Sequence, residues 1–176
     1  MSIKDTAPCN TDLLQRSKFI LSFPRIITTQ FFCQAVNIPG ISSINTLQNT
    51  PFSDLNIPGD KINWEEFRME FLIDEELESW KQVYNWIRGI SFPTEFEEYK
   101  QLDKQSRYSS QVTYPQYADA ELIIQSAMNQ SKTKLKFVDM FPISLTGIPL
   151  DIRLGSEHTV TATAIFKYKR YDFVTI

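Results

Sequence analysis

The stretch TVTATAIFKYKRYDF, residues 159–173, decides the fold class of this chain. Five apolar side chains in it alternate with threonine, isoleucine and lysine: Val160, Ala162, Ala164, Phe166 and Tyr168. A period of two places alternate side chains on opposite faces of a β-strand, whereas a helix repeats every 3.6 residues. We therefore predict one long strand here, with the Phe166 row buried and the threonine row on the other face.

Other β-rich runs extend this prediction over most of the chain. They lie at residues 18–23, 28–37, 41–48, 61–74, 120–128 and 134–140. In 61–74 the phase slips near Glu65-Glu66, as it does at a β-bulge. Residues 49–60 contain two prolines and are predicted to be a loop, and Phe141-Pro142 is predicted to end the 134–140 strand. The expected fold is mainly β, an antiparallel β-sandwich or β-barrel.

One amphipathic helix is predicted over about residues 75–88. Asp74 precedes it as the expected N-cap, acidic side chains fill its first turn, and Gly89 is expected just past its end. An apolar stripe of this helix is predicted to pack on a sheet: Leu77, Trp80, Tyr84 and Ile87.

Composition bounds the kind of protein. With 176 residues, 42% of them hydrophobic, the chain is long enough for one domain with its own core. We expect an N-terminal arm at 1–14, one domain at 15–176, and long loops at 49–61 and 93–117. No run of about 18 apolar residues is present, so we expect no membrane span. A net charge of −3 argues against tight, non-specific binding to nucleic acid.

Catalytic chemistry finds little support in the residue types. His158 is the only histidine, and Cys9 and Cys33 are the only cysteines, which we expect to be reduced. Cys33 with His158, or the acidic cluster at Asp74, would be the candidates for a hydrolase, but strand packing and helix capping explain them better. We therefore predict no enzyme activity, no cofactor and no metal site.

Several segments, taken in chain order, resemble the tail-tube proteins of contractile-tailed bacteriophages. They are Ile38-Pro39-Gly40, residues 52–61, residues 71–75 with 84–87, residues 139–145 and residues 161–168. The resemblance implies a sandwich or barrel with one flanking helix, forming stacked hexameric rings whose lumen conducts DNA during ejection. More remotely, the chain resembles the tube protein of type VI secretion and tube-like baseplate proteins.

The same resemblance implies a place and partners for the protein. It would belong to the virion, in the phage tail, after assembly in the host cytoplasm. Its partners would be other copies of itself and the sheath, baseplate and tape-measure proteins, and DNA would pass without specific binding. We expect the subunit and ring interfaces to involve Phe52, Asp54, Leu55, Ile57, Asp60, Lys61, Thr159, Thr161, Thr163 and Lys167.

Two other functions remain open from the sequence. The first is a baseplate or tail-end ring that initiates a tube and has the same fold. The second is a monomeric ligand-binding β-barrel, in which the helix would act as a lid and the aromatic side chains would line a pocket.

Overall fold

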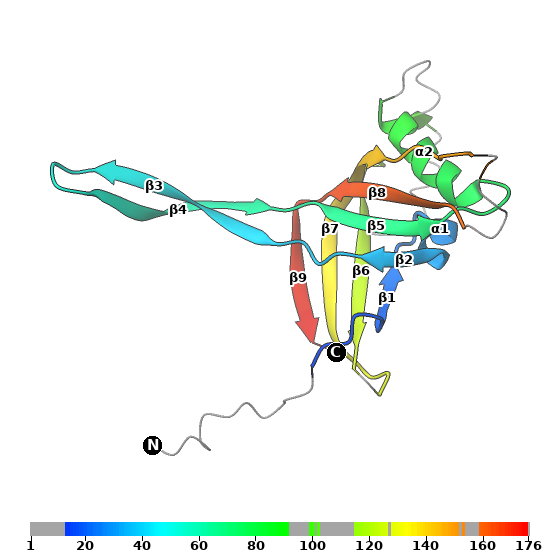
Figure 1. Ribbon diagram of the computed structural model, residues 1–176, viewed down its shortest axis with the longest axis horizontal. Helices are drawn as coiled ribbons and strands as arrows, with labels where there is room; N and C mark the ends of the chain where they lie inside the picture. The colour runs from blue at the N-terminus through cyan, green and yellow to red at the C-terminus, as the bar shows by residue number, and fades with distance from the viewer. Residues whose placement is uncertain are drawn as a thin grey trace.

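A computed structural model describes residues 13–91, 99, 100, 102, 115–126, 128–151, 153 and 159–175 (Figure 1). Residues 1–12 of the predicted N-terminal arm, most of the predicted 93–117 loop and His158 lie outside this described part. Within it the elements are β1 (Phe19–Ser22), α1 (Ile27–Phe31), β2 (Cys33–Val36), β3 (Ile41–Asn49), β4 (Asp54–Trp64), β5 (Phe67–Leu72), α2 (Glu78–Ser91), β6 (Ala118–Gln125), β7 (Ser131–Leu145), β8 (Thr161–Lys167) and β9 (Arg170–Thr175).

Seven of these strands form one folded antiparallel sheet, because β7 belongs to both of its parts. The first part of β7 pairs with β6 and β9, and β6 pairs with β1. The last part of β7 pairs with β8, followed by β5 and then β2. We call the first set sheet A and the second set sheet B. Their strands cross steeply in Figure 1, as in orthogonally packed sheets, and the predicted mainly β class is confirmed.

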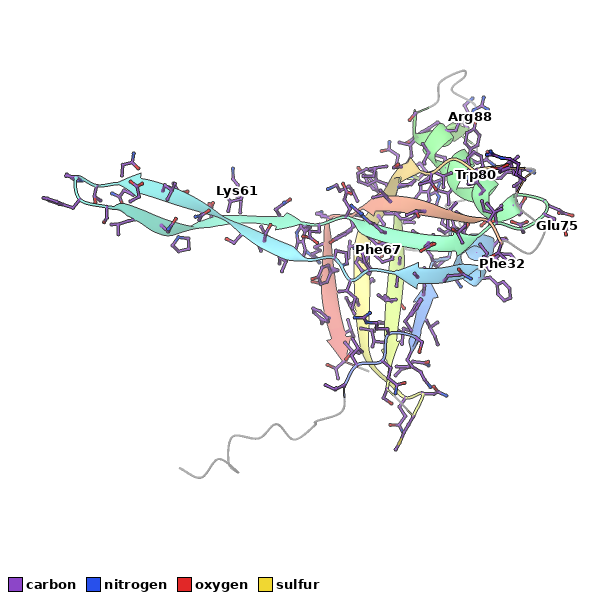
Figure 2. The ribbon with its side chains drawn as sticks, in the orientation of Figure 1. Phe32, Lys61, Phe67, Glu75, Trp80 and Arg88 are labelled. Atoms are coloured by element: carbon purple, nitrogen blue, oxygen red, sulfur yellow. The ribbon has the colours of Figure 1, made fainter. Side chains whose placement is uncertain are left out.

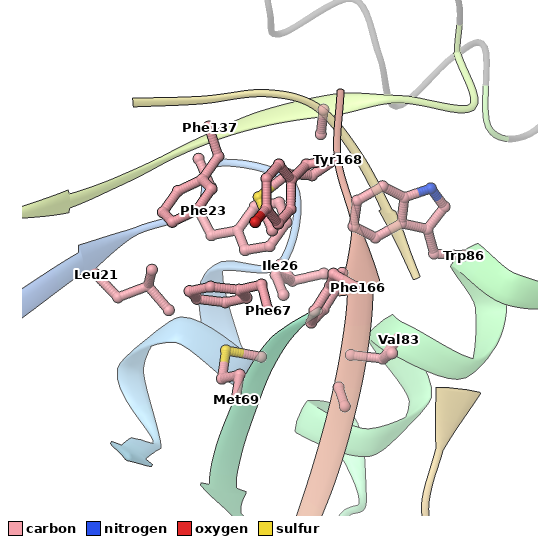
Figure 3. Packing of buried hydrophobic residues seen from close by; sticks show 14 of the residues in the cluster. Leu21, Phe23, Ile26, Phe67, Met69, Val83, Trp86, Phe137, Phe166 and Tyr168 are labelled. Atoms are coloured by element: carbon pink, nitrogen blue, oxygen red, sulfur yellow. The ribbon is translucent and has the colours of Figure 1, made fainter. Parts of the chain in front are cut away.

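The core lies between the two sheets and is dominated by aromatic rings (Figure 3). Phe67 and Phe166 of sheet B lie with their ring centroids 6.1 Å apart, and Phe67 is 5.0 Å from Phe137 of sheet A. Trp86 of α2 lies 6.0 Å from Phe166 and 5.7 Å from Phe23. These contacts confirm the predicted buried row of β8 and show that α2 contributes to the same core.

Helix α2 differs from its predicted position. It runs from Glu78 to Ser91 because a turn with Leu77 at φ 58° precedes it. Asp74 still caps its start: its carboxylate accepts hydrogen bonds from the N–H groups of Glu78, at 3.0 Å, and Ser79, at 2.8 Å. Gly89 lies inside the helix, where a Cβ atom would be 2.6 Å from Cγ of Leu102.

The predicted packing stripe of this helix is corrected as well. Its buried residues are Ser79, Val83, Trp86 and Gly89. Trp80 and Ile87 are only partly buried, and Leu77 and Tyr84 remain 37% and 41% exposed. The stripe lies beside the buried face because the helix is rotated so that Trp86 points into the core.

The strand predicted over 28–37 is divided into the short helix α1 and β2. Tertiary hydrogen bonds explain this difference, because Oε1 of Gln82 in α2 accepts from the N–H groups of Thr28 and Thr29 at 3.2 and 3.4 Å. The hydroxyl of Thr29 also donates to the Ser79 carbonyl at 2.7 Å. A partner 50 residues away therefore overrides the β preference of the two threonines.

Two strand ends were predicted incorrectly. Pro142 does not end β7, since from residue 141 onward this strand is an edge of sheet B, where proline is tolerated next to a register shift. The long strand predicted from Thr159 begins at Thr161 and is broken after Lys167, so that β8 belongs to sheet B and β9 to sheet A.

The prediction of a loop at 49–61 is also wrong. Residues 54–64 form β4, which pairs with β3. The single bulged strand predicted over 61–74 is in fact two strands, β4 and β5, separated at Glu65 and Glu66, and they pair with different partners.

Candidate assembly interface

The strands β3 and β4 form a two-stranded arm that projects away from the body of the molecule (Figure 1). They pair only with each other, and every residue of β3 is exposed. Figure 2 shows side chains on both sides of the arm with no other element covering them. A hairpin of two strands is at best marginally stable in water when nothing packs on it.

The arm carries a high density of large apolar side chains. Their exposed fractions run from 42% to 98%: Ile41, Ile44, Leu47, Phe52, Leu55, Ile57 and Ile62. Such a set, exposed on one projecting element, is typical of a surface that binds another protein. Nothing in the described part of this chain covers it.

A bulge bends the arm near its middle. Ser43 pairs with Ile62 and Asn45 with Pro58, so that Ile44 alone faces three residues of β4. The backbones come so close here that a Cβ atom on Gly59 would lie 2.0 Å from the Ile44 carbonyl oxygen. Only glycine fits this position, and it allows β4 to accommodate Pro58.

The base of the arm is fixed to sheet A by aromatic side chains. The ring of Trp64, at the end of β4, lies 4.9 Å from Tyr171 of β9 and 6.2 Å from Tyr168. The Tyr171 hydroxyl donates to the Pro39 carbonyl at 3.2 Å, and the Gly40 N–H donates to Glu65 at 3.1 Å. The arm therefore leaves the body next to β9 in a defined direction.

Sheet A has unpaired strands at both of its edges. Its order is β1-β6-β7-β9, and in the described residues neither β1 nor β9 has a second partner. Five of the six residues of β9 are exposed, including Phe173, and only Tyr171 is partly buried. An exposed edge strand offers unpaired backbone N–H and C=O groups to another strand.

The predicted interface residues fall on two separate surfaces. Phe52 lies at the tip of the arm, and Asp54, Leu55, Ile57, Asp60 and Lys61 lie on β4. The remainder lie on or next to β8: Thr159, Thr161, Thr163 and Lys167. Because β8 pairs on both sides, with β5 and β7, the threonine row lies on a sheet face and β8 is not an edge strand.

A third surface is a groove between α2 and the end of β7. Trp80 and Tyr84 stack there with ring centroids 5.1 Å apart, and Ile87 lines the groove together with Ile143 and Leu145. Trp80, Tyr84 and Ile87 were predicted to pack on a sheet, and their helical spacing does place them on one side of α2. Their partial exposure follows from the orientation of Trp86, which no local pattern reveals.

Of the residues considered for catalysis, Asp74 caps α2, Cys33 lies in β2, and His158 lies outside the described residues. Burial raises the pKa of the Cys33 thiol to about 11, so the thiol is protonated near neutral pH and a weak nucleophile. In the part of the chain that the structure describes, no three potential metal-ligating side chains come together. None of the described helices is long and apolar enough to cross a membrane.

The orthogonal sandwich, with unpaired sheet edges and an uncovered arm, presents surfaces suited to contact with another protein, and known proteins have the same fold. A chain in the structure of the tube-terminating cap of the anti-feeding prophage superimposes with a TM-score of 0.63 at 12% identity, over the full length of both chains. The sheath–tube complex of the PVC extracellular contractile injection system, in its extended state, contains a chain that matches with a TM-score of 0.58 at 13% identity, covering 100% of this chain and 99% of that one.

The sequence identifies the family. The phage tail tube protein family matches residues 15–174, and the chain belongs to it. The tail tube terminator protein of Enterobacteria phage T4 is 25% identical over 162 residues, which cover 89% of this chain and 86% of that protein. The predicted resemblance to tail-tube proteins is thereby confirmed.

Proposed function

We propose that this chain is a structural subunit that forms the ring terminating the tube of a contractile phage tail. The observation that carries ring formation is the arm, whose apolar side chains have no cover within the described chain. The position at the end of the tube is supported by the similarity to the T4 tail tube terminator along most of both sequences. Membership of a structural family also favours a non-enzymatic role.

Ring closure would proceed through the edges of sheet A. The strand β9 of one copy would pair with β1 of the next, and repetition around a hexamer would join the sheets into one closed barrel. Closure removes the exposed edges that each isolated copy presents. The arm leaves the body beside β9, on the side opposite β1, so it would extend over the neighbour that β9 contacts (Figure 1).

The partners follow from this placement. The ring would stack on the tube, contact the sheath and other tail proteins, and surround a lumen through which DNA passes without specific binding. The protein would be found in the phage tail and would assemble in the host cytoplasm. The predicted contacts of Thr159, Thr161, Thr163 and Lys167 would lie on the outward face of sheet B.

A second candidate is the repeating subunit of the tube itself. It is favoured by the tail tube family match and by the fold shared with a chain of a sheath–tube complex. The two candidates differ in whether one ring can stack on another without limit.

Negative-stain electron microscopy of the purified chain, combined with sedimentation velocity, separates these functions. We expect discrete rings for a terminator. Long tubes would identify the repeating subunit instead. A chain that stays monomeric at high concentration would contradict both and would favour a ligand-binding β-barrel.

A further inference from the structure

A row of apolar side chains crosses the core face of sheet A and ends at an uncovered phenylalanine. Directly paired residues of neighbouring strands point to the same face of a sheet. The strand register joins four such residues into one row from β1 to β9: Leu21, Leu122, Leu135 and Phe173. The three leucines are at most 5% exposed, whereas Phe173 is 66% exposed. Its aromatic side chain lies 5.6 Å from that of Tyr171, and the rest of its surface is left open at the edge strand.

A groove lies at the opposite edge, between β1, α1 and β2. These three elements are together on the side of the molecule away from β9 and the arm (Figure 1). The groove has a volume of about 450 Å³, and none of the residues that the structure places in its lining is charged. Its apolar lining includes Phe19, Leu21, Ile27, Phe31 and Cys33. On the α1 side, Ile27 is 65% and Phe31 82% exposed, so this groove is also uncovered in the isolated chain.

The directions of the two edge strands are compatible with pairing between copies. All three pairings within sheet A are antiparallel, so strand direction alternates from β1 through β6 and β7 to β9. The strand β9 therefore runs opposite to β1. When β9 of one copy pairs with β1 of the next, as the proposed ring requires, this new pairing is antiparallel like the other three.

The period of two then determines what Phe173 meets. A shift of the register by one residue would turn the core-side row of β9 to the wrong face of the joined sheet, so the allowed registers differ by two residues. Because β1 has four residues and β9 has six, two of these registers pair the whole of β1. One places Phe173 opposite Leu21 and the other places it opposite Phe19. Both residues line the groove, and side chains directly opposite each other have their Cβ atoms about 4.5–5.5 Å apart.

We infer that Phe173 of each copy inserts into the groove between β1, α1 and β2 of the next copy. This inference rests on the proposed ring. Insertion removes Phe173, Ile27 and Phe31 from water at once, and no charged side chain of the groove lining has to be desolvated. An aromatic side chain that fills an apolar pocket is the typical anchor of a protein interface. The hydrophobic core of one copy would thereby continue into the core of its neighbour.

The test truncates each side of this contact separately and together. Phe173→Ala removes the inserted side chain, and Phe31→Ala removes part of the groove wall. The matched control is Val174→Ala, because Val174 lies on the same strand but on the opposite face of sheet A and is 40% exposed. Thermal unfolding of the dilute monomers would verify that every variant folds. Sedimentation velocity over a series of dilutions would give the concentration at which each variant's rings dissociate.

The expected effects follow from the burial of a phenylalanine, which changes an association constant about 10- to 100-fold. Phe173→Ala and Phe31→Ala should each raise the dissociation concentration about tenfold or more, and Val174→Ala should raise it less than about threefold. If the two phenylalanines touch across the interface, the double variant should weaken the rings clearly less than the product of the two single effects.

Chemical crosslinking gives an independent measure of proximity, because Cys33 lines the groove. In a Cys9→Ser background, a short bismaleimide should join the thiol introduced by Phe173→Cys to Cys33 of the next copy. Denaturing gels should then show a ladder of covalently linked subunits. The control Val174→Cys should give no ladder, because the joined sheet lies between its thiol and the groove.

Three results would overturn the inference. Rings of Phe173→Ala that are as stable as those of Val174→Ala would show that this side chain is not buried between copies. Single effects that multiply in the double variant would show that the two phenylalanines do not meet. A crosslinked ladder from Val174→Cys but not from Phe173→Cys would place the opposite face of β9 at the groove. Absence of rings from the wild-type chain would instead refute the proposed function, and the inference with it.

Discussion

Replacing Gly59 by alanine should abolish assembly while leaving the body of the subunit folded. The new Cβ atom would lie 2.0 Å from the Ile44 carbonyl oxygen, and Cβ contacts below 3.0 Å are essentially never found. The two backbones must therefore separate by about 1 Å at the bulge, which disturbs the pairs on either side of it. The loss of roughly two backbone hydrogen bonds costs about 1–3 kcal/mol. That is as much as an uncovered hairpin has in total stability.

The effect on assembly can be scaled from the arm's apolar side chains. Seven of them are at least 42% exposed. Full burial of such a side chain contributes about 1.5–3 kcal/mol, so completing the burial of half-exposed ones would contribute roughly 1 kcal/mol each. If misalignment removes about 3 kcal/mol of this, the association constant for each contact falls about a hundredfold. Sedimentation velocity should show rings for the wild type and monomers for G59A.

The body should be unaffected, because the arm contributes no residue to the fully buried core. We expect the thermal unfolding midpoint of monomeric G59A to remain within about 2 °C of the wild-type monomer. G147A is the matched control, since a Cβ there meets no atom within 4 Å. Normal rings from G59A would refute the role of the arm, and a large drop in its unfolding midpoint would refute the independence of arm and body.

Three further changes test the fold. Phe166→Asp places an unpaired charge among Phe23, Phe67 and Trp86, so we expect loss of the cooperative unfolding transition as well as of assembly; normal assembly would mean that this row of β8 is not buried. The hydrogen bond from the Ser79 side chain lowers the pKa of Asp74 to about 2, so this carboxylate stabilises the fold above about pH 4 and ceases to do so as pH falls toward 2. Asp74→Asn should therefore cost about 1 kcal/mol in urea unfolding at pH 7, because a neutral amide accepts these hydrogen bonds more weakly than a carboxylate and solvent screens the group; an equal difference at pH 2 would contradict the linkage. Burial raises the pKa of Tyr168 to about 12, and its hydroxyl has no hydrogen-bond partner among the described residues. Tyr168→Phe should therefore leave the free energy of unfolding unchanged or raise it by about 1 kcal/mol. A clearly lower free energy of unfolding would show that the hydroxyl has a partner.

Sequence patterns predicted the secondary structure correctly where one face of an element packs against the core. The alternation around Phe166 predicted the buried row of β8, and β5 has the same alternation, with Phe67 and Phe71 buried. In both strands one face is buried, so apolar residues occupy every second position and the sequence shows a period of two. The helix was recognised from its helical period, although the predicted stripe lies beside its buried face.

Sequence patterns did not predict the elements whose structure depends on contacts with residues far away in the chain, or on the lack of such contacts. The helix α1 exists because Gln82 satisfies the N–H groups at its start. The strand β4 has no buried face, so Pro58 and Gly59 suggested a loop although both fit a bulged, exposed strand. Its residues were nevertheless chosen as interface candidates, because the family resemblance was concentrated there. The arm that displays them and the unpaired edges of sheet A become apparent only in three dimensions.

The strand β7 connects sheet A and sheet B. The first part of β7 lies between β6 and β9, and its last part is an edge strand beside β8, with a bend near Asp139 at φ 55° between them. Since a peptide chain scarcely stretches, a pull on sheet B reaches sheet A along the covalent bonds of β7. The two sheets of one copy are therefore mechanically coupled, and in the proposed ring a load on one sheet would be transmitted to the other along this strand.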